Sequence, residues 1–232
     1  VGGLSNESLR QKRTTFGVLA TAAVTIPFLV TLYLGWSVFQ SGPFTVNFGT
    51  FIDAGRWSVD LAYLIDPLSI TMALVITGIG TLIHIYSIGY MSHDQGAWRF
   101  FAYLNLFIFA MLQLVMADNL LVLFIGWEGV GLASYLLIGF WFKKRTNTNA
   151  ANKAFIFNRI GDFAFLVAMF LLLQEVGTLQ FSGLLENLGM MSQDTLFWVG
   201  LLVLIGATGK SAQFPYLYGF QMQWQAQPQF LH

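Results

Sequence analysis

Cysteine is absent from the 232 residues, so the chain has neither disulfides nor thiolate ligands for zinc or iron–sulfur clusters. Charged residues are also scarce, at 9% of the sequence, whereas soluble domains contain about 25%. The 11 Lys and Arg residues balance the 11 Asp and Glu residues, which leaves no basic excess for binding nucleic acid. The three histidines include no pair at metal-ligand spacing. These deficits indicate a protein whose surface mostly avoids water, with no nucleic-acid partner and no metal site.

Apolar residues make up 56% of the sequence and gather in long runs. A bilayer core needs about 20 apolar residues per helix. Five segments meet that length, and a sixth begins near Thr195. The five segments are Phe16–Phe39, Pro67–Met91, Phe100–Ala117, Asn119–Phe142 and Lys153–Gln174. The sequence therefore predicts an all-α integral membrane bundle of five full spans and a partial sixth, in contact with the lipid bilayer.

One stretch departs from the helical pattern. Apolar residues alternate with polar or small ones over residues 44–48 and again over residues 57–63, with Asp53-Ala54-Gly55 between them. A period of two on both sides of a turn indicates a β-hairpin. We expect this hairpin, at about residues 44–63, to lie on one membrane face.

The basic residues set the orientation, because cytoplasmic loops are enriched in Lys and Arg. With alternating spans, a single basic residue, Arg56, falls on the side of the hairpin and of the acidic loop 175–194. The basic residues on the other side are Arg10, Lys12, Arg13, Arg99, Lys143, Lys144, Arg145 and Lys153. The hairpin is therefore predicted to be extracytoplasmic, and the protein to be multi-pass in a bacterial cytoplasmic (inner) membrane.

Four charged residues lie within the predicted spans. Glu128 is near the middle of the fourth span, Arg159 and Asp162 are one turn apart in the fifth, and Lys210 is well inside the sixth. On insertion scales, placing one such group at a helix centre costs about 2.5–3.5 kcal/mol of free energy. Small residues around Glu128 and Lys210 allow helices to approach closely, so we expect these two to make contact across the bundle. Such a pair suits proton transfer, because separating it favours release of the lysine proton.

Two structural alternatives stay open at this point. Arg159 and Asp162 are spaced i, i+3 and could simply neutralise each other on one helix face. His84, toward the cytoplasmic end of the second span, is either a hydrogen-bonded packing residue or a proton relay.

Several motifs, in this order and spacing, resemble the L subunit of respiratory complex I, a family that includes mitochondrial subunit 5 and its chloroplast-type homologue. The stretches that carry the resemblance are Leu64–Ser69, Ile83–Met91, Arg99–Tyr103, Ala117–Leu120, Gly126–Leu132, Ser134–Trp141, Lys153–Asp162 and Gly209–Gln213. The resemblance implies an antiporter-like, proton-translocating membrane subunit of NADH–quinone oxidoreductase. In the family, the glutamate matching Glu128 and the lysine matching Lys210 form the coupled pair of a half-channel.

The resemblance further implies that this chain binds no cofactor, since NADH, FMN, iron–sulfur clusters and quinone belong to partner subunits. The other membrane subunits of complex I are the expected partners, and the proton is the transported ion. The alternatives are a subunit of a multisubunit cation/proton antiporter and a non-functional truncated product.

The family also sets expectations for the two ends. Residues 1–15 are predicted to be a cytoplasmic basic segment after a missing first span, and residues 16–215 a partial proton-channel domain. The Gln-rich residues 216–232 differ from the family's continuation. Codons can be chosen for this tail so that the neighbouring frame encodes Trp-Leu-Pro-Asp-Ala-Met, which is that continuation. We therefore predict a frameshift after about Pro215, which resequencing of the coding DNA can check.

Overall fold

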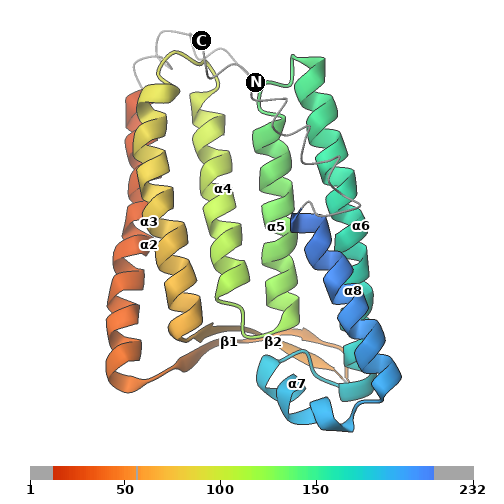
Figure 1. The fold of residues 1–232 in the computed structure, drawn as a ribbon. Helices are drawn as coiled ribbons and strands as arrows, with labels where there is room; N and C mark the ends of the chain where they lie inside the picture. The colour runs from red at the N-terminus through yellow and green to blue at the C-terminus, as the bar shows by residue number, and fades with distance from the viewer. Residues whose placement is uncertain (1–12, 56, 212–232) are drawn as a thin grey trace.

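Long helices stand side by side in the computed structural model, and a two-stranded sheet crosses one end of them (Figure 1). The structure describes residues 13–55 and 57–211. Its elements are α2 (Arg13–Ser41), β1 (Phe44–Asp53), β2 (Ser58–Ile65), α3 (Pro67–Tyr90), α4 (Ala97–Val115), α5 (Leu120–Ile138), α6 (Arg145–Val176), α7 (Phe181–Asn187), η1 (Leu188–Met190) and α8 (Gln193–Ser211).

Five of these helices, α2 to α6, are long and apolar enough to cross a membrane. They correspond to the five predicted spans, and α8 corresponds to the partial sixth. Large apolar side chains stay exposed along the outer faces of the bundle, as a lipid environment requires. The predicted all-α membrane bundle is confirmed, and the chain is a multi-pass membrane protein.

The boundaries of α5 and α6 differ from the prediction. α5 ends at Ile138 rather than near Phe142, and α6 begins at Arg145 rather than near Lys153. The first turns of α6 are polar, yet Asn147 and Ala151 are buried against neighbouring elements. Apolar length marks the part of a helix that crosses the lipid, whereas packing beyond the lipid decides where the helix ends.

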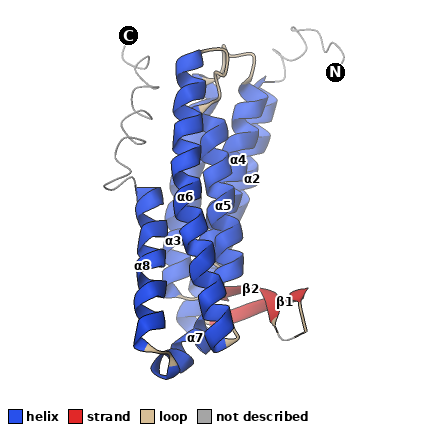
Figure 2. Cartoon of the chain, turned by 90° about the vertical axis from the view of Figure 1, so that its right-hand side faces the viewer, coloured by secondary structure: helices blue, strands red, loops and turns tan. Residues whose placement is uncertain are grey.

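The predicted hairpin is confirmed. β1 and β2 pair antiparallel from Phe44↔Ile65 to Asp53↔Ser58, with irregular register between Asn47 and Ile52. At its tip, Gly55 adopts a φ of 72°, a left-handed conformation that glycine tolerates best. Figure 2 shows the hairpin projecting sideways beneath the helices.

Side-chain caps begin two of the helices. Asp66 precedes Pro67, and its Oδ1 accepts a hydrogen bond from the Ser69 amide at 2.7 Å. The Asp66 amide in turn donates to Ser69 Oγ at 2.9 Å, which completes a capping box. Asn119 caps α5 by accepting from the Val122 amide at 2.9 Å. The starts of α3 and α5 agree with the predicted spans, which begin at Pro67 and Asn119.

The turn between α4 and α5 joins the elements at this end of the bundle. Backbone bonds link the Leu64 amide to Met116 O at 2.8 Å and the Leu120 amide to Leu179 O at 3.0 Å. The buried Asn119 side chain donates to Asp60 O at 2.9 Å. The hairpin, the α4–α5 turn and the segment before α7 therefore form one connected layer.

The two ends of the bundle carry different loops. The hairpin and α7 lie at one end, and the loops that join α3 to α4 and α5 to α6 lie at the other (Figure 1). Arg99 belongs to the second end, where its guanidinium lies 5.8 Å from the Phe140 ring centroid. This separation matches the alternating topology on which the predicted orientation depends.

Glycines allow α8 to pack closely on α6. A Cβ added at Gly161 would lie 3.2 Å from Gly206 O and 3.3 Å from Gly209 Cα. The described part of α8 ends about halfway along α6, so its last turn lies between the two ends of the bundle, beside the middle of α6 (Figures 1 and 2). Lys210 is in that last turn.

Candidate functional site

The four charged residues predicted from the sequence lie on three adjacent helices. Glu128 comes from α5, Arg159 and Asp162 come from α6, and Lys210 comes from α8. α5 packs on α6, and α6 packs on α8. The structure therefore brings all four side chains into one cluster, which we call the α5–α6–α8 charge cluster.

Glu128 forms an ion pair with Arg159 across the α5–α6 interface. The Arg159 side chain is 45% exposed and that of Glu128 is 23% exposed, so this pair lies at the edge of the described bundle. The Arg159 guanidinium also lies 4.6 Å from the centroid of the Phe155 ring on the same helix. These contacts direct the arginine toward α5.

Asp162 and Lys210 form the inner part of the cluster. Lys210 Nζ lies 3.6 Å from Asp162 Oδ1, and the two side chains are 17% and 3% exposed. Trp127 Nε1 donates to the same Asp162 oxygen at 2.6 Å. Lys210 Nζ is also 5.5 Å from the centroid of the Trp127 ring. The buried carboxylate thus faces one ammonium and one indole N–H.

The predicted ion pair between Glu128 and Lys210 is wrong, because each of these two side chains pairs with a different residue. Within the cluster, Glu128 pairs with Arg159 and Asp162 pairs with Lys210. Arg159 and Asp162 are not paired with each other either, although they are one turn apart. The glycine contacts of α8 with α6 place Lys210 against Asp162, which leaves Glu128 to the arginine. Lys210 is still near enough to Glu128 for an electrostatic interaction.

The Lys210 ammonium has unusual surroundings for a charged group. Its nitrogen is buried, and no hydrogen-bond partner for it exists among the described residues. A Cβ added at Gly131 would lie 2.8 Å from this nitrogen, so Gly131 leaves room for the ammonium. The cluster therefore alternates acids and bases across three helices and contains one lysine that is held loosely. Its carboxylates and its lysine are groups that can exchange protons without any redox chemistry.

His84 lies apart from the cluster, between α3 and α4. The side chain is 1% exposed, its Nδ1 lies 2.7 Å from Gly80 O, and Asn105 Nδ2 lies 3.4 Å from its Nε2. The carbonyl can only accept, so Nδ1 carries a proton. Neither partner titrates, and these contacts are those of a packing residue. A relay role for His84 stays a prediction.

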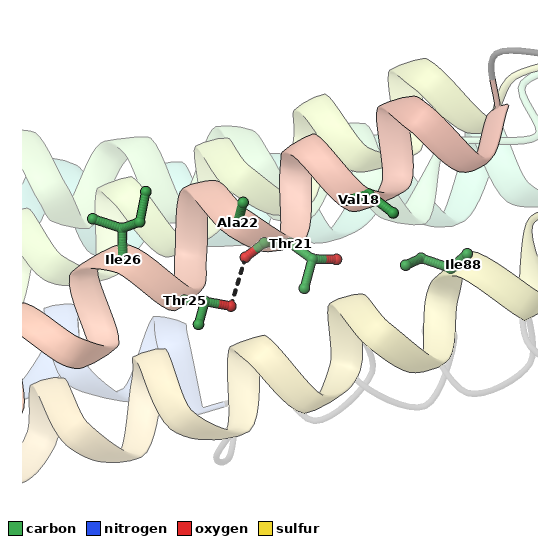
Figure 3. Close-up of a pocket in the computed structure, with 6 residues that line it drawn as sticks. All are labelled: Val18, Thr21, Ala22, Thr25, Ile26 and Ile88. Atoms are coloured by element: carbon green, nitrogen blue, oxygen red, sulfur yellow. Dashed lines mark hydrogen bonds between the residues drawn. The ribbon is translucent and has the colours of Figure 1, made fainter.

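The structure also contains two apolar hollows. One, of about 300 Å³, lies between α3 and α4 and includes His84 in its lining. The other is a groove of about 340 Å³ along α2, with Ile88 of α3 opposite (Figure 3). Its two hydroxyl groups are already bonded within α2, Thr21 to Gly17 O at 2.8 Å and Thr25 to Thr21 O at 2.9 Å. Neither hollow presents a charged group.

Metal ions in proteins are held by sets of ligand side chains such as His, Asp and Glu. Residues 13–55 and 57–211 contain no cluster of three His, Asp or Glu side chains that could hold a metal ion.

Comparisons with known proteins identify the family. The family model described as the N-terminus of NADH-ubiquinone oxidoreductase (complex I) chain 5 matches residues 51–101. The model described as the transmembrane domain of NADH:quinone oxidoreductase and the Mrp antiporter matches residues 117–220. NADH-quinone oxidoreductase subunit L of Mycobacterium tuberculosis (strain CDC 1551 / Oshkosh) is 52% identical over 166 residues. The chain belongs to the subunit L family.

Other members of the subunit L family match most of the chain. The subunit L of Campylobacter jejuni is 43% identical over 209 residues, which is 90% of this chain and 34% of the relative. The subunit L of Escherichia coli K12 is 42% identical over 211 residues, which is 89% of this chain and 34% of the relative. The mycobacterial match covers 72% of this chain and 26% of that relative. The chain thus spans between a quarter and a third of the length of these relatives.

Two solved structures share the fold. The Mrp complex from Dietzia sp. DQ12-45-1b superposes with a TM-score of 0.70 at 23% identity, over 91% of this chain and 24% of that chain. The membrane-bound sulfane sulfur reductase, an archaeal respiratory membrane complex, superposes with a TM-score of 0.72 at 16% identity, over 93% of this chain and 35% of that chain. The antiporter-like architecture expected of a subunit L family member is therefore confirmed.

For this member of the subunit L family, sequence reasoning found the charged residues but missed Trp127. A signal for it was present, because Trp127 directly precedes Glu128 and is spaced i, i+4 from Gly131. The predictions for the basic N-terminal residues 1–12, for Pro215 and for the tail 216–232 fall outside the described residues. They stay predictions.

Proposed function

We propose that this chain forms part of the proton path in the membrane arm of an NADH–quinone oxidoreductase. The α5–α6–α8 charge cluster carries this proposal, because three of its four charged groups lie on α5 and α6, which are long and apolar enough to cross a membrane. The fourth, Lys210, lies on α8, which packs on α6. Such groups are costly in lipid and usually mark ion or proton pathways. Membership of the subunit L family supports the same assignment.

In the proposed mechanism, Lys210 is the group that releases and regains the proton. Its ammonium lies in a buried position beside Asp162 and donates no hydrogen bond to a described residue. When the ammonium leaves Asp162, the protonated lysine loses the attraction that stabilises its charge. It then passes a proton to water or to a nearby base and becomes a neutral amine. Glu128 stands within electrostatic reach as the alternative anionic partner.

Arg159 has the complementary role. A guanidinium stays protonated under all ordinary conditions, so it cannot carry the proton itself. It can stabilise the negative charge of Glu128, with which it is paired. Movement of Arg159 toward Asp162, which lies one turn away on the same helix, would free Glu128 for Lys210. Exchange of partners among the four groups thereby couples proton release to the electrostatic state of the neighbouring subunits.

The chemistry that drives this movement belongs to partner subunits in this proposal. NADH oxidation, FMN, iron–sulfur clusters and quinone reduction would all be located there, and this chain would bind no cofactor. The other membrane subunits of complex I would contact it laterally within the bilayer. The exposed apolar side chains on the outer faces of the bundle are compatible with either lipid or such neighbours.

The test is a Glu128→Gln exchange in an NADH–quinone oxidoreductase that contains this segment, measured as NADH-driven proton uptake by inverted membrane vesicles. We expect pumping to fall about tenfold or more, the factor that corresponds to losing one charge-assisted interaction. Glu186→Gln is the matched control, because Glu186 is exposed on α7 away from the cluster. Undiminished pumping by Glu128→Gln would rule out an essential role for the Glu128 carboxylate in proton translocation.

A cation/proton antiporter subunit is the second candidate. It is favoured by the matching domain model, whose description covers both NADH:quinone oxidoreductase and the Mrp antiporter. Replacing sodium and potassium by choline in the same vesicle assay separates the two. NADH-driven pumping that persists supports the first function, whereas exchange that requires sodium or potassium supports the second. A non-functional product would assemble no active complex in either medium.

A further inference from the structure

Trp127 touches both members of the inner ion pair with different parts of one rigid ring. The indole edge donates from Nε1 to Asp162 Oδ1 at 2.6 Å. The ring itself lies 5.5 Å from Lys210 Nζ, within the range of a cation–π interaction. The position of Trp127 thus influences both charges at once.

The ring is held firmly by its own neighbours. It stacks on the ring of Phe165 with centroids 5.5 Å apart and planes 10° apart. Phe165 in turn stacks on Phe124 with centroids 5.8 Å apart. Three aromatic rings from α5 and α6 therefore form one stack. The stack limits how the indole can tilt, and the indole is itself one planar group, so its N–H and its ring face keep a fixed relation to each other.

The ion pair beside this stack is longer than a hydrogen-bonded one. Lys210 Nζ is 3.6 Å from Asp162 Oδ1, whereas charge-assisted N–H···O bonds are about 2.7–2.9 Å long. The shorter bond to the same oxygen comes from Trp127. Gly131 leaves room for the ammonium, since a Cβ at this position would lie 2.8 Å from Nζ. The lysine is therefore paired with Asp162 electrostatically but is not locked to it.

We propose that Trp127 is a positioning residue whose indole N–H holds Asp162 Oδ1 and partly offsets its negative charge, which keeps Lys210 in a loose, exchangeable ion pair. Packing alone does not require tryptophan here, because phenylalanine could continue the aromatic stack. The indole N–H is the part that only tryptophan supplies. The consequence for proton movement rests on the proposed function, whereas the effect on the ion pair does not.

The first measurement is the distance between Lys210 Nζ and the Asp162 carboxyl carbon, by ¹⁵N–¹³C dipolar solid-state NMR on the chain in lipid bilayers. The signal of Lys210 is assigned by its loss in Lys210→Arg. In Trp127→Phe we expect the distance to shorten, because the lysine replaces the missing donor and closes to hydrogen-bond length. Incorporation of benzothienylalanine at position 127, which keeps the bicyclic shape and replaces N–H by sulfur, must give the same shortening.

Trp141→Phe is the matched control. Trp141 Nε1 also donates to a carboxylate, Asp94 Oδ2 at 2.9 Å, but in the segment that joins α5 to α6. Its replacement removes the same kind of hydrogen bond and must leave the Lys210–Asp162 distance unchanged. The proposal is overturned if the Lys210–Asp162 distance fails to shorten in Trp127→Phe or in the benzothienylalanine variant. A shortening that Trp141→Phe reproduces also overturns it, because the effect would then be a general one.

The second measurement is NADH-driven proton pumping by the oxidoreductase that carries Trp127→Phe. We expect pumping about tenfold lower, as one charge-assisted hydrogen bond is worth at least that factor. We also expect Trp127→Phe to cause no further loss of pumping in a complex that already carries Asp162→Asn. If the two substitutions lower pumping additively, Trp127 has a structural role and the proposal is overturned. If the distance shortens but the wild-type complex pumps no protons, the positioning role stands and the proposed function fails.

Discussion

Arg159 of α6 pairs with Glu128 of α5, and not with Asp162 three residues further along its own helix. Asp162 pairs with Lys210 of α8 instead. Each ion pair thus joins two helices, so the charges contribute to how α5, α6 and α8 are held together. A pair confined to one helix would neutralise charge without linking the helices. Substitutions of these residues can therefore affect the packing of the helices, the movement of protons, or both.

The Glu128–Arg159 pair should show energetic coupling in a double-mutant cycle. We expect Glu128→Gln and Arg159→Gln to be non-additive by about 1 kcal/mol in the free energy of unfolding, a modest value because Arg159 is 45% exposed. Denaturing-detergent titration of the chain in bicelles measures it. The cycle for Arg159 and Asp162 serves as the comparison and should show weaker coupling. Stronger coupling of Arg159 to Asp162 than to Glu128 would mean that the arginine pairs within its own helix.

Close packing of α8 on α6 should depend on Gly161. Its replacement by alanine places a Cβ 3.2 Å from Gly206 O and 3.3 Å from Gly209 Cα, so α8 must shift by a few tenths of an ångström to accommodate it. We expect a loss of about 1–3 kcal/mol in unfolding free energy and a longer Lys210–Asp162 distance.

Gly200→Ala on α8 is the control for this change. A Cβ at Gly200 would meet no atom within 4 Å, so the exchange should be neutral or slightly stabilising through helix propensity. Equal effects of Gly161→Ala and Gly200→Ala would contradict the close approach.

The turn before α5 should depend on two separate functions of Asn119. Its Oδ1 caps α5 at the Val122 amide, and its Nδ2 donates to Asp60 O in the hairpin. Serine keeps the cap but not the reach to the hairpin, so Asn119→Ser should lose about 1 kcal/mol of stability. Asn119→Ala should lose about 2 kcal/mol because both bonds are gone. Thermal unfolding followed by circular dichroism measures both variants, and equal losses would show that only the bond to the hairpin matters.

His84 provides a test that distinguishes packing from proton relay. Glutamine can keep a donor toward Gly80 O and an acceptor toward Asn105, the two contacts observed for the imidazole. We therefore expect His84→Gln to pump normally in inverted vesicles, whereas His84→Leu should lower stability by about 1–3 kcal/mol by leaving Asn105 with an unsatisfied donor. A large loss of pumping in His84→Gln with unchanged stability would assign the relay role instead.

The predictable part of this protein depends on local patterns. The spans follow from apolar length, the hairpin from alternation around Asp53-Ala54-Gly55, and the start of α3 from Asp66-Pro67. Each of these features is decided by residues close together in the chain. The polar first turns of α6 were missed, because their helical state depends on burial of Asn147 and Ala151 against other elements.

The candidate site divides in the same way. The sequence by itself determined which side chains are costly in lipid, since a charge within an apolar run needs no partner to be recognised. The tertiary structure alone decided their partners, because pairing depends on how each helix is rotated and how near its neighbour lies. Glycine contacts between α6 and α8 place Lys210 beside Asp162, and the aromatic stack directs Trp127 to the same carboxylate. Contacts between distant segments leave no local pattern, so only the packed helices could reveal them.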